Sequence, residues 1–313
     1  MKAPGKFYRE GISFVELIKM FPDNDKSREW FESRRWKDGA YCPHCGSLNV
    51  QCNVKHPTQT HRCRDCSNKP FFSVKTGTIM HKSNLDYQTW AIAIYMFTTN
   101  LKGVSSMKLH RELEITQKSA WLLVSKLRKA YEVKDSKLKG IVEVDETYMG
   151  GKEANKHESK KLKAGRGTVG KTAVFGMKER ESGRIVARVI ADTKKETLQG
   201  LVRENTEEGT EIHSDENQSY KGLENHKTVN HSIGEYVKGN VHTNGIESMW
   251  AMFKRGHKGT YHKMSPKHLH RYVAEFVGRH NHRKSDTIDQ MTDLVIGMND
   301  KRLTYNQLVG SNA

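Results

Sequence analysis

Hydrophobic residues follow a helical period through much of the first 133 residues. Phe14, Leu17 and Ile18 fall on one side of a predicted helix. A second short helix is expected after Pro22, with two aromatic residues on its apolar side. From about residue 85 to residue 133 the pattern is helical again, and proline is absent. The sequence therefore predicts a mostly helical N-terminal part, interrupted by a turn-rich segment that carries the cysteines.

The pattern becomes that of an α/β fold after about residue 140. Residues 141–144 predict a strand that is apolar except for one glutamate. The elements expected after it are strands within 171–179, 183–192, 209–220 and 227–232, and helices within 194–205, 244–253 and 265–283. Residues 152–171 are basic, contain glycine and have no apolar period, which predicts a mobile loop. The tail from Lys284 is polar, with a weak helical segment.

Four of the five cysteines form two C-x-x-C pairs: Cys42, Cys45, Cys63 and Cys66. Seventeen residues separate the pairs, which is a spacing typical of a structural zinc site. Four thiolates complete a tetrahedral shell around Zn²⁺ and leave no open position for catalysis. A structural zinc ribbon is therefore predicted over residues 37–75. His44 and His61 are rival ligands by position, and Cys52 is expected to be a free thiol.

The charge balance points to a polyanionic partner. The chain has 53 Lys and Arg residues against 36 Asp and Glu residues, a formal net charge of +17. Nucleic acid is the first candidate and an anionic membrane surface the second. No apolar run approaches the roughly 20 residues that span a bilayer, and the N-terminus lacks the long apolar segment of a secretory signal. The chain is therefore expected to stay inside the cell.

The helical segment before the α/β part has the outline of a helix-turn-helix. Two short helices flank the sequence LEIT, and the second would carry a polar, basic face that can enter a DNA groove. The residues of that face are Gln117, Lys118, Ser119, Lys126, Arg128 and Lys129. The alternative is an ordinary helical bundle with a solvated basic side. The predicted ribbon and the net charge favour DNA contact.

Two acidic residues are placed at strand ends in the α/β part. Asp145 is expected to end the first strand, and Asp215 lies where the fourth strand passes into a loop. If these strands are neighbours, the two side chains can meet at an edge where ligands commonly bind. Two carboxylates that share a site repel each other, which suggests a cation between them. Oxygen ligands select Mg²⁺ or Mn²⁺.

A third acid lies on the helix that begins near Asn244. One apolar stripe is formed by Ile246, Met249, Trp250 and Phe253. Glu247 and Lys254 are seven residues apart and share a face beside that stripe. The helix can therefore pack on the sheet while Glu247 reaches the metal site and Lys254 points to where a phosphate would lie. The alternative is a solvated edge with a surface ion pair.

These motifs together resemble a known family. Three strands, a helix, a fourth strand with Asp215 and a helix with Glu247 resemble the ribonuclease H-like core of DDE transposases. The resemblance is closer to the zinc-ribbon-bearing transposases of bacterial insertion sequences that are akin to eukaryotic Merlin elements. It is carried by VDETYMGGKEANKH, GRGTVGKTAVFGM, HSDENQSY, HTNGIESMWAMFKRG and YHKMSPKHLHRYVAEFVGRHNHR. It covers nearly the whole chain.

The resemblance implies a catalytic site with two divalent ions, Mg²⁺ or Mn²⁺. Asp145, Asp215 and Glu247 would be the metal-binding triad, and Lys254 the basic residue downstream of the third acid. Some members of the group are described with Asn in the third position, so Asn244, one turn before Glu247, is the alternative.

The resemblance also implies the fold, partners and activity. The expected fold is multidomain α+β, comprising an N-terminal helical segment (1–36), zinc ribbon (37–75), helix-turn-helix-like segment (80–135), ribonuclease H-like catalytic domain (138–283) and C-terminal tail (284–313). The partner is double-stranded DNA, both the terminal inverted repeats of the element and the target. The chain would act as a homo-oligomer, at least a dimer on DNA, in the bacterial cytoplasm near the nucleoid and away from membranes. It would cleave the element ends and transfer the strands.

Two rival functions remain open from the sequence. A metal-dependent nuclease or resolvase would use the same core without strand transfer. A zinc-ribbon transcription regulator would bind DNA specifically without a divalent ion and without cleavage.

Overall fold

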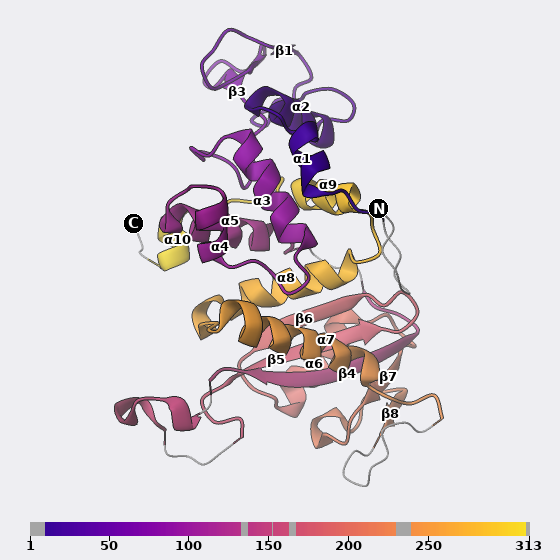
Figure 1. The fold of residues 1–313 in the computed structure, drawn as a ribbon. Coiled ribbons are helices and arrows are strands. Elements are labelled where there is room, and N and C mark those ends of the chain that lie inside the picture. Colours follow the sequence, from indigo (N-terminus) through magenta and orange to yellow (C-terminus); the bar gives the residue numbers. More distant parts are fainter. Residues whose placement is uncertain (1–9, 133–136, 152, 163–166, 230–238, 311–313) are drawn as a thin grey trace. The chain divides into compact units, whose positions relative to one another are not determined.

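The computed structural model describes residues 10–132, 137–151, 153–162, 167–229 and 239–310 (Figure 1). The chain divides into two units. The first consists of residues 1–133 together with 282–313, and the second of residues 134–281. The second unit is therefore an insertion between two parts of the first.

Helices dominate the first unit, as predicted. α1 (Phe14–Met20) begins with a capping box, in which Ser13 and Glu16 each accept a backbone N–H from the other. α2 (Asn24–Arg35) begins after Asp23, whose carboxylate accepts the Lys26 N–H at 2.7 Å. The remaining helices are α3 (Tyr87–Thr99), α4 (Ser106–Glu112), α5 (Gln117–Ala130), α9 (Thr287–Ile296) and α10 (Tyr305–Val309).

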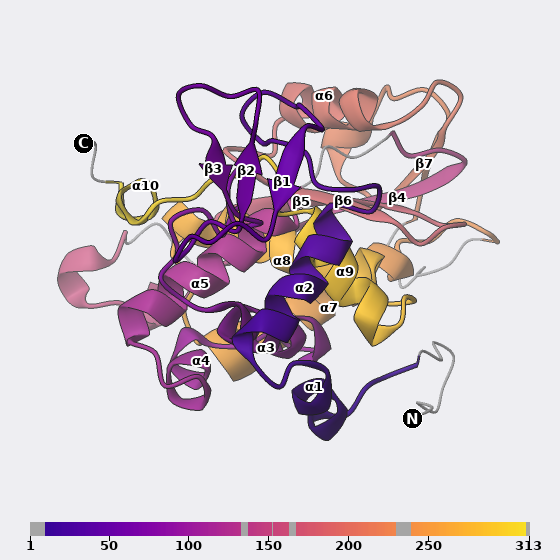
Figure 2. The ribbon, with the colours of Figure 1, turned by 90° about the horizontal axis from the view of Figure 1, so that it is seen from above.

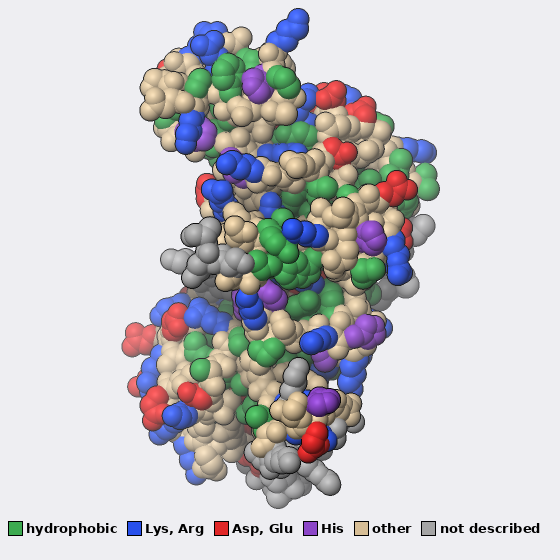
Figure 3. Space-filling model, turned by 90° about the vertical axis from the view of Figure 1, so that its left-hand side faces the viewer, with side chains coloured by type: hydrophobic (Ala, Val, Ile, Leu, Met, Phe, Trp, Pro, Cys, Tyr) green, Lys and Arg blue, Asp and Glu red, His purple; other side chains and the backbone are tan. Residues whose placement is uncertain are grey.

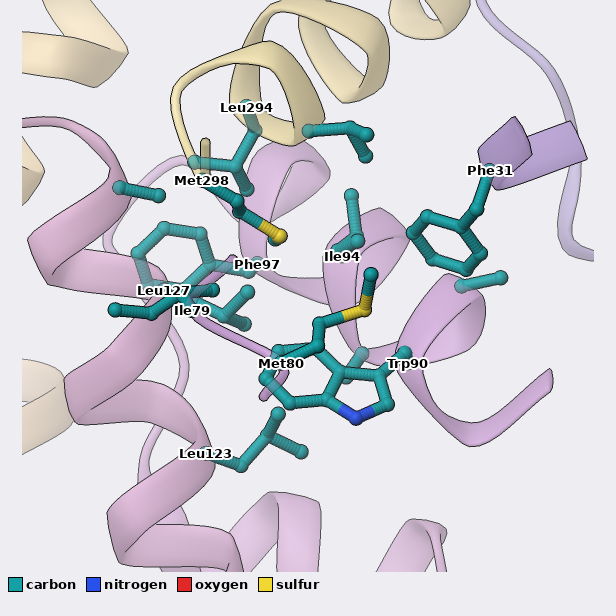
Figure 4. Close-up of a cluster of buried hydrophobic side chains, with 14 of the residues drawn as sticks. Phe31, Ile79, Met80, Trp90, Ile94, Phe97, Leu123, Leu127, Leu294 and Met298 are labelled. Carbon is teal, nitrogen blue, oxygen red and sulfur yellow. The ribbon is translucent and has the colours of Figure 1, made fainter. Parts of the chain in front are cut away.

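One hydrophobic core holds the first unit together. Phe31 of α2, Trp90 and Phe97 of α3, and Leu127 of α5 are fully buried in it. Figure 4 shows these side chains together with Leu294 and Met298 from the C-terminal segment. The tail was expected to be polar with a weak helical segment. It instead forms two helices whose apolar sides complete this core.

The cysteine-bearing segment of the first unit contains a small antiparallel sheet. Its strands are β1 (Val50–Cys52), β2 (His61–Cys63) and β3 (Phe71–Phe72), in that order. They lie side by side in Figure 2. Tight turns before β1 and after β2 carry the two C-x-x-C motifs.

The second unit is built on a five-stranded mixed sheet. The strands are β4 (Ile141–Met149), β5 (Thr172–Glu179), β6 (Ile185–Ile190), β7 (Glu211–Ser214) and β8 (His226–Thr228). Their order across the sheet is β6-β5-β4-β7-β8. β4, β5 and β6 form an antiparallel meander, whereas β7 lies parallel to β4 and β8 parallel to β7.

Helices cover both faces of this sheet. α6 (Lys195–Asn205) packs on one face through Leu198 and Val202. α7 (Asn244–Gly256) and α8 (Leu269–Asn281) pack on the other, where Ile246 and Phe253 of α7 are fully buried. Figures 1 and 2 show α6 on the side of the sheet opposite to α7 and α8. Side chains along each strand therefore alternate between an α6 face and an α7 face.

The segment expected to be a mobile loop, 152–171, contains two short 3₁₀ turns, η1 (Glu153–Asn155) and η2 (Glu158–Lys160). Lys152 and residues 163–166 lie outside the described residues, so the mobility remains a prediction. The strand expected within 227–232 is observed as β8, and residues 230–232 lie outside the description. Among the residues that are described, no helix is both long enough and apolar enough to cross a membrane.

Candidate functional sites

The four predicted zinc ligands converge in the first unit. The ligand sulfurs of Cys42, Cys45, Cys63 and Cys66 all lie within 4.8 Å of one another. The Sγ atoms of Cys42 and Cys66 are 3.7 Å apart, as are those of Cys45 and Cys63. Zn–S bonds of about 2.3 Å in a tetrahedron place sulfurs about 3.8 Å apart, so the quartet fits Zn²⁺.

The thiols need a cation to ionise at this site. Hydrogen bonding with the Cys45 thiol raises the pKa of Cys66 to about 12, whereas a bound Zn²⁺ deprotonates a coordinating thiol outright. His61, one of the rival ligands, is outside the quartet. Its ring is buried and packs against Trp36 and Phe72, and burial lowers its pKa to about 4. The predicted four-cysteine zinc ribbon is confirmed.

In the second unit, the structure corrects the position expected for Asp145. The sequence predicted that this residue ends the first strand, but β4 continues to Met149. The reason is that β5 pairs with β4 along this length, from Val142 opposite Glu179 to Met149 opposite Thr172. On its other side, β4 pairs with β7 only as far as Glu143. Asp145 therefore lies in mid-strand, just beyond the end of the β4–β7 ladder.

Asp145 and Asp215 are on neighbouring parallel strands, as the sequence analysis required. The β4–β7 register pairs Glu143 with His213. Two further residues along each chain lead to Asp145 and to Asp215, which directly follows β7. The charge of Asp215 is one of the causes that raise the pKa of Asp145, in agreement with this proximity.

Helix α7 brings the third acid to the same face. Ile246 and Phe253 anchor the helix in the core, and Glu247 lies half-buried beside them. The Glu247 carboxylate accepts a hydrogen bond from the Thr243 hydroxyl at 2.7 Å, and its charge also raises the pKa of Asp145. Asn244 is the first residue of α7 and is exposed.

Lys254 is in the last turn of α7 and is exposed. It is seven residues, or two turns, after Glu247, so both lie on the same side of the helix. The charge of Glu247 influences Asp145, whereas the roles of Glu247 as a metal ligand and of Lys254 as a phosphate-facing cation stay predictions.

The acidic side chains around Asp145 repel one another, so they cannot all stay ionised without a cation. Burial, followed by the charges of Glu146, Asp215 and Glu247, raises the pKa of Asp145 to about 8. Burial likewise raises the pKa of Glu146 to about 7, although a hydrogen bond from the Tyr220 hydroxyl opposes that shift. At neutral pH the Asp145 carboxyl is then largely protonated, and that of Glu146 about half protonated, unless a cation compensates the charge. Carboxylate oxygens are the donors that Mg²⁺ and Mn²⁺ prefer. Among the described residues, however, only the four cysteines have their ligand atoms within 4.8 Å of one another.

Glu146 points away from the triad. Val142 and Val144 belong to the core on the α6 face, and Glu146 continues that alternation. Its contact with Tyr220, a fully buried member of the same core, agrees with this direction.

The sequence analysis did not identify Arg180 as part of this region. Its guanidinium binds buried Glu143 on the α7 face at 3.0 Å, and a lone arginine in a turn gives no signal that could have revealed this contact.

The helix-turn-helix prediction is corrected in one respect. α4 and α5 are joined by residues 113–116, and their pairing has the expected outline. Lys126 and Arg128 were expected on the polar, basic face that would contact DNA, but both are buried. The Lys126 ammonium lies 5.9 Å from the ring centre of Trp90 of α3. The exposed polar residues of α5 are confined to its first turn, with Gln117 and Lys118.

Comparisons with known proteins match both units. A model of the ISXO2-like transposase domain matches residues 137–281, and a model of a transposase zinc-ribbon domain matches residues 22–69. The chain is also 28% identical over 255 residues to a Halobacterium salinarum protein described as an uncharacterized protein in transposable element ISH50. That alignment covers 76% of this chain and 84% of the relative.

Proposed function

We propose that this chain cleaves and joins DNA at the ends of a mobile element. Residues 137–281 match the ISXO2-like transposase domain, and residues 22–69 match a transposase zinc-ribbon domain. The observation that carries the proposal is the convergence of Asp145, Asp215 and Glu247 from two parallel strands and one helix. The charges of both partners raise the pKa of Asp145. A shared divalent ion would account for three acidic residues that lie near enough to influence one another's charge.

The fold supports this assignment. The sheet order β6-β5-β4-β7-β8, with three antiparallel strands followed by two parallel ones, is the arrangement we infer to be ribonuclease H-like. In that arrangement the first strand is central, and the strand that follows the first helix lies beside it. Asp145 and Asp215 are therefore brought together by topology, and α7 adds Glu247 from the covering layer.

Asp145, Asp215 and Glu247 would hold the ions. When bound, two divalent ions stabilise the attacking and leaving oxygens of an in-line displacement at phosphorus. Thr243 keeps the Glu247 carboxylate oriented through its hydroxyl. Lys254 lies about 10 Å farther along the α7 axis, so its ammonium would contact a neighbouring DNA phosphate and hold the strand in place.

The positively charged side chains of the protein would bind the phosphate backbone of the DNA. Lys and Arg side chains are spread over the face drawn in Figure 3 rather than gathered in one patch. Such a distribution suits a long polyanion contacted at many phosphates. The partners are the two element ends and the target duplex, and joining two ends requires at least two copies of the chain.

The test is a cleavage and joining assay with a labelled element end and a target plasmid. The full-length protein in Mg²⁺ should nick the end and join it to the plasmid. Asp145→Asn and Asp215→Asn should each bind the end normally but produce no cut. Thr292→Ala serves as a control, because Thr292 is in α9 of the other unit and donates to a backbone carbonyl.

The rival functions predict other outcomes. Cleavage without joining would identify a nuclease or resolvase. Specific end binding that needs no divalent ion and gives no cut would identify a DNA-binding regulator. Unchanged cleavage by both aspartate variants would mean that the proposed metal site is wrong.

A further inference from the structure

An ion pair with a buried carboxylate, Glu143–Arg180, lies next to the acidic triad on the same face of the sheet. Glu143 precedes Asp145 by two residues on β4 and is only 2% exposed. Its Oε1 accepts hydrogen bonds from Arg180 Nε at 3.1 Å and from Nη2 at 3.0 Å. Arg180 directly follows β5. Because side chains alternate along a strand, Glu143 and Asp145 face the same side of the sheet.

The same carboxylate fixes the start of α7. Glu143 Oε2 accepts the backbone N–H of Ile246 at 3.0 Å, one residue before Glu247. A Cβ on Gly245 would lie 2.5 Å from that oxygen, so only glycine allows the approach. A negative charge at a helix N-terminus is favourable. Glu143 therefore connects the strand that carries Asp145 to the helix that carries Glu247.

Arg180 extends the connection to β7. Its Nη2 donates to His213 Nδ1 at 3.2 Å and to the His242 carbonyl at 2.9 Å. His213 is fully buried and precedes Asp215 by two residues. Since arginine can only donate, His213 Nδ1 accepts this hydrogen bond. The proton of the neutral ring is therefore on Nε2, which donates a hydrogen bond to Glu211 Oε1 at 2.5 Å. All three elements that carry the triad thus meet at one ion pair.

We propose that the Glu143–Arg180 pair is a positioning device that sets the separation of Asp145, Asp215 and Glu247, and so the affinity of the site for its divalent ions. The inference rests on the proposed function, because it assumes that the three carboxylates bind those ions. Stability alone explains the pair poorly, since apolar residues often replace a buried ion pair without loss of stability. Its hydrogen bonds, in contrast, fix the strands and the helix at one spacing.

The test measures metal binding without DNA and without turnover. Mn²⁺ is titrated into the full-length zinc-loaded protein, and free Mn²⁺ is followed by electron paramagnetic resonance. Glu143→Gln should raise the Mn²⁺ dissociation constant about tenfold or more, the usual effect of removing a group that orients metal ligands. Glu204→Gln is the matched control, because Glu204 pairs with Arg188 at 3.1 Å in the same unit but in an exposed position. It should bind Mn²⁺ as the unchanged protein does.

A double variant separates positioning from folding. Glu143→Met with Arg180→Met removes both charges of the pair and should restore the melting temperature if Glu143→Gln lowers it. Positioning predicts that Mn²⁺ binding stays weak in the double variant even when its melting temperature is normal. If Glu143→Gln does not fold, Mn²⁺ binding by the double variant still tests the proposal. Recovery of Mn²⁺ affinity along with stability would assign the pair a structural role and overturn the proposal.

Failure of the inference and failure of the proposed function give different results. If the unchanged protein binds Mn²⁺, Asp145→Asn does not, and Glu143→Gln binds normally, only the positioning role is lost. If Asp145→Asn binds as the unchanged protein does, the triad is not the metal site, and both proposals are overturned.

Discussion

The indole of Trp250 occupies the space where a side chain on Gly176 would stand. Gly176 is on β5, opposite Asp145 of β4. A Cβ there would lie 2.5 Å from Trp250 Cζ2 and 3.1 Å from Ile246 Cδ1, both in α7. The absence of a side chain at Gly176 therefore sets how closely α7 approaches the sheet at the level of the acidic site.

We expect Gly176→Ala to push α7 away from the sheet. Overpacking of this kind costs about 1–3 kcal/mol, so the melting temperature should fall, and cleavage should weaken because Glu247 moves with the helix. Gly200→Ala is the matched control. Gly200 is exposed in the middle of α6 with nothing near its Cβ position, so alanine there should stabilise the protein by up to about 1 kcal/mol. Equal melting temperatures for the two variants would contradict this reading of the interface.

Loss of the ribbon cysteines should release the zinc. The double variant Cys42→Ser/Cys63→Ser should lose about one zinc per chain and expose residues 37–75 to proteolysis, because metal binding and folding are coupled in such sites. Metal content by atomic absorption and limited proteolysis measure the two effects. Cys52→Ser is the control, since Cys52 is exposed and outside the quartet. Zinc retained by the double variant would exclude this quartet as the zinc site.

Glu247→Gln should distinguish the two candidates for the third ligand. The amide keeps the shape of the side chain beside Ile246 but removes the charge that holds a hard cation. Cleavage of a labelled end in Mg²⁺ should be abolished while end binding stays nearly intact. Asn244→Ala should lower the rate only in part. Lys254→Ala should also slow cleavage, through loss of phosphate positioning rather than of metal affinity.

The opposite pattern of activities in these variants would assign the third catalytic role to Asn244 instead of Glu247. Near-normal cleavage by Glu247→Gln together with an inactive Asn244→Ala variant would identify Asn244 as the third catalytic residue. Asn244 is exposed in the first turn of α7, three residues before Glu247, and so remains the alternative.

The metal-free protein should lose stability as the pH rises. The pKa of Asp145 is about 8 in the folded protein and near 3.8 when the chain is unfolded. Between these values the folded state holds a proton that the unfolded state has released, so the free energy of unfolding decreases from about pH 4 to pH 8. Melting temperatures at pH 6 and pH 8 should show a smaller decrease in Asp145→Asn. Added Mg²⁺ should stabilise the unchanged protein more at pH 8 than at pH 6, and an equal effect at both would contradict the prediction.

The elements that carry the three acidic residues could be predicted because strand alternation and helical spacing are local patterns, whereas the neighbouring position of β4 and β7 could only be assumed. The alternation along β4 and the seven-residue step from Glu247 to Lys254 depend only on neighbouring residues. The end of the strand was misplaced because polar residues normally mark a strand end. Here β5 continues to pair with β4 to Met149, and only the ladder to β7 stops early.

Contacts between distant segments could not be predicted in this way. Arg180 and Glu143 are 37 residues apart, and no period connects them. Lys126 was assigned to the polar, basic face of α5 because a charge pattern is read along one helix alone. The buried ammonium instead lies 5.9 Å from the ring centre of Trp90 in α3, a contact that the pattern along α5 does not reveal.

Because the second unit is inserted into the first, it is synthesised before the first unit's C-terminal part. Residues 134–281 leave the ribosome before α9 and α10 exist, so the sheet that carries the acidic residues can fold while the first unit still lacks part of its core. Met291, Leu294 and Met298 are fully buried in that core and are synthesised only after the second unit. A nascent chain that has not yet reached α9 would therefore expose the apolar surface of α3 and α5 that these residues cover.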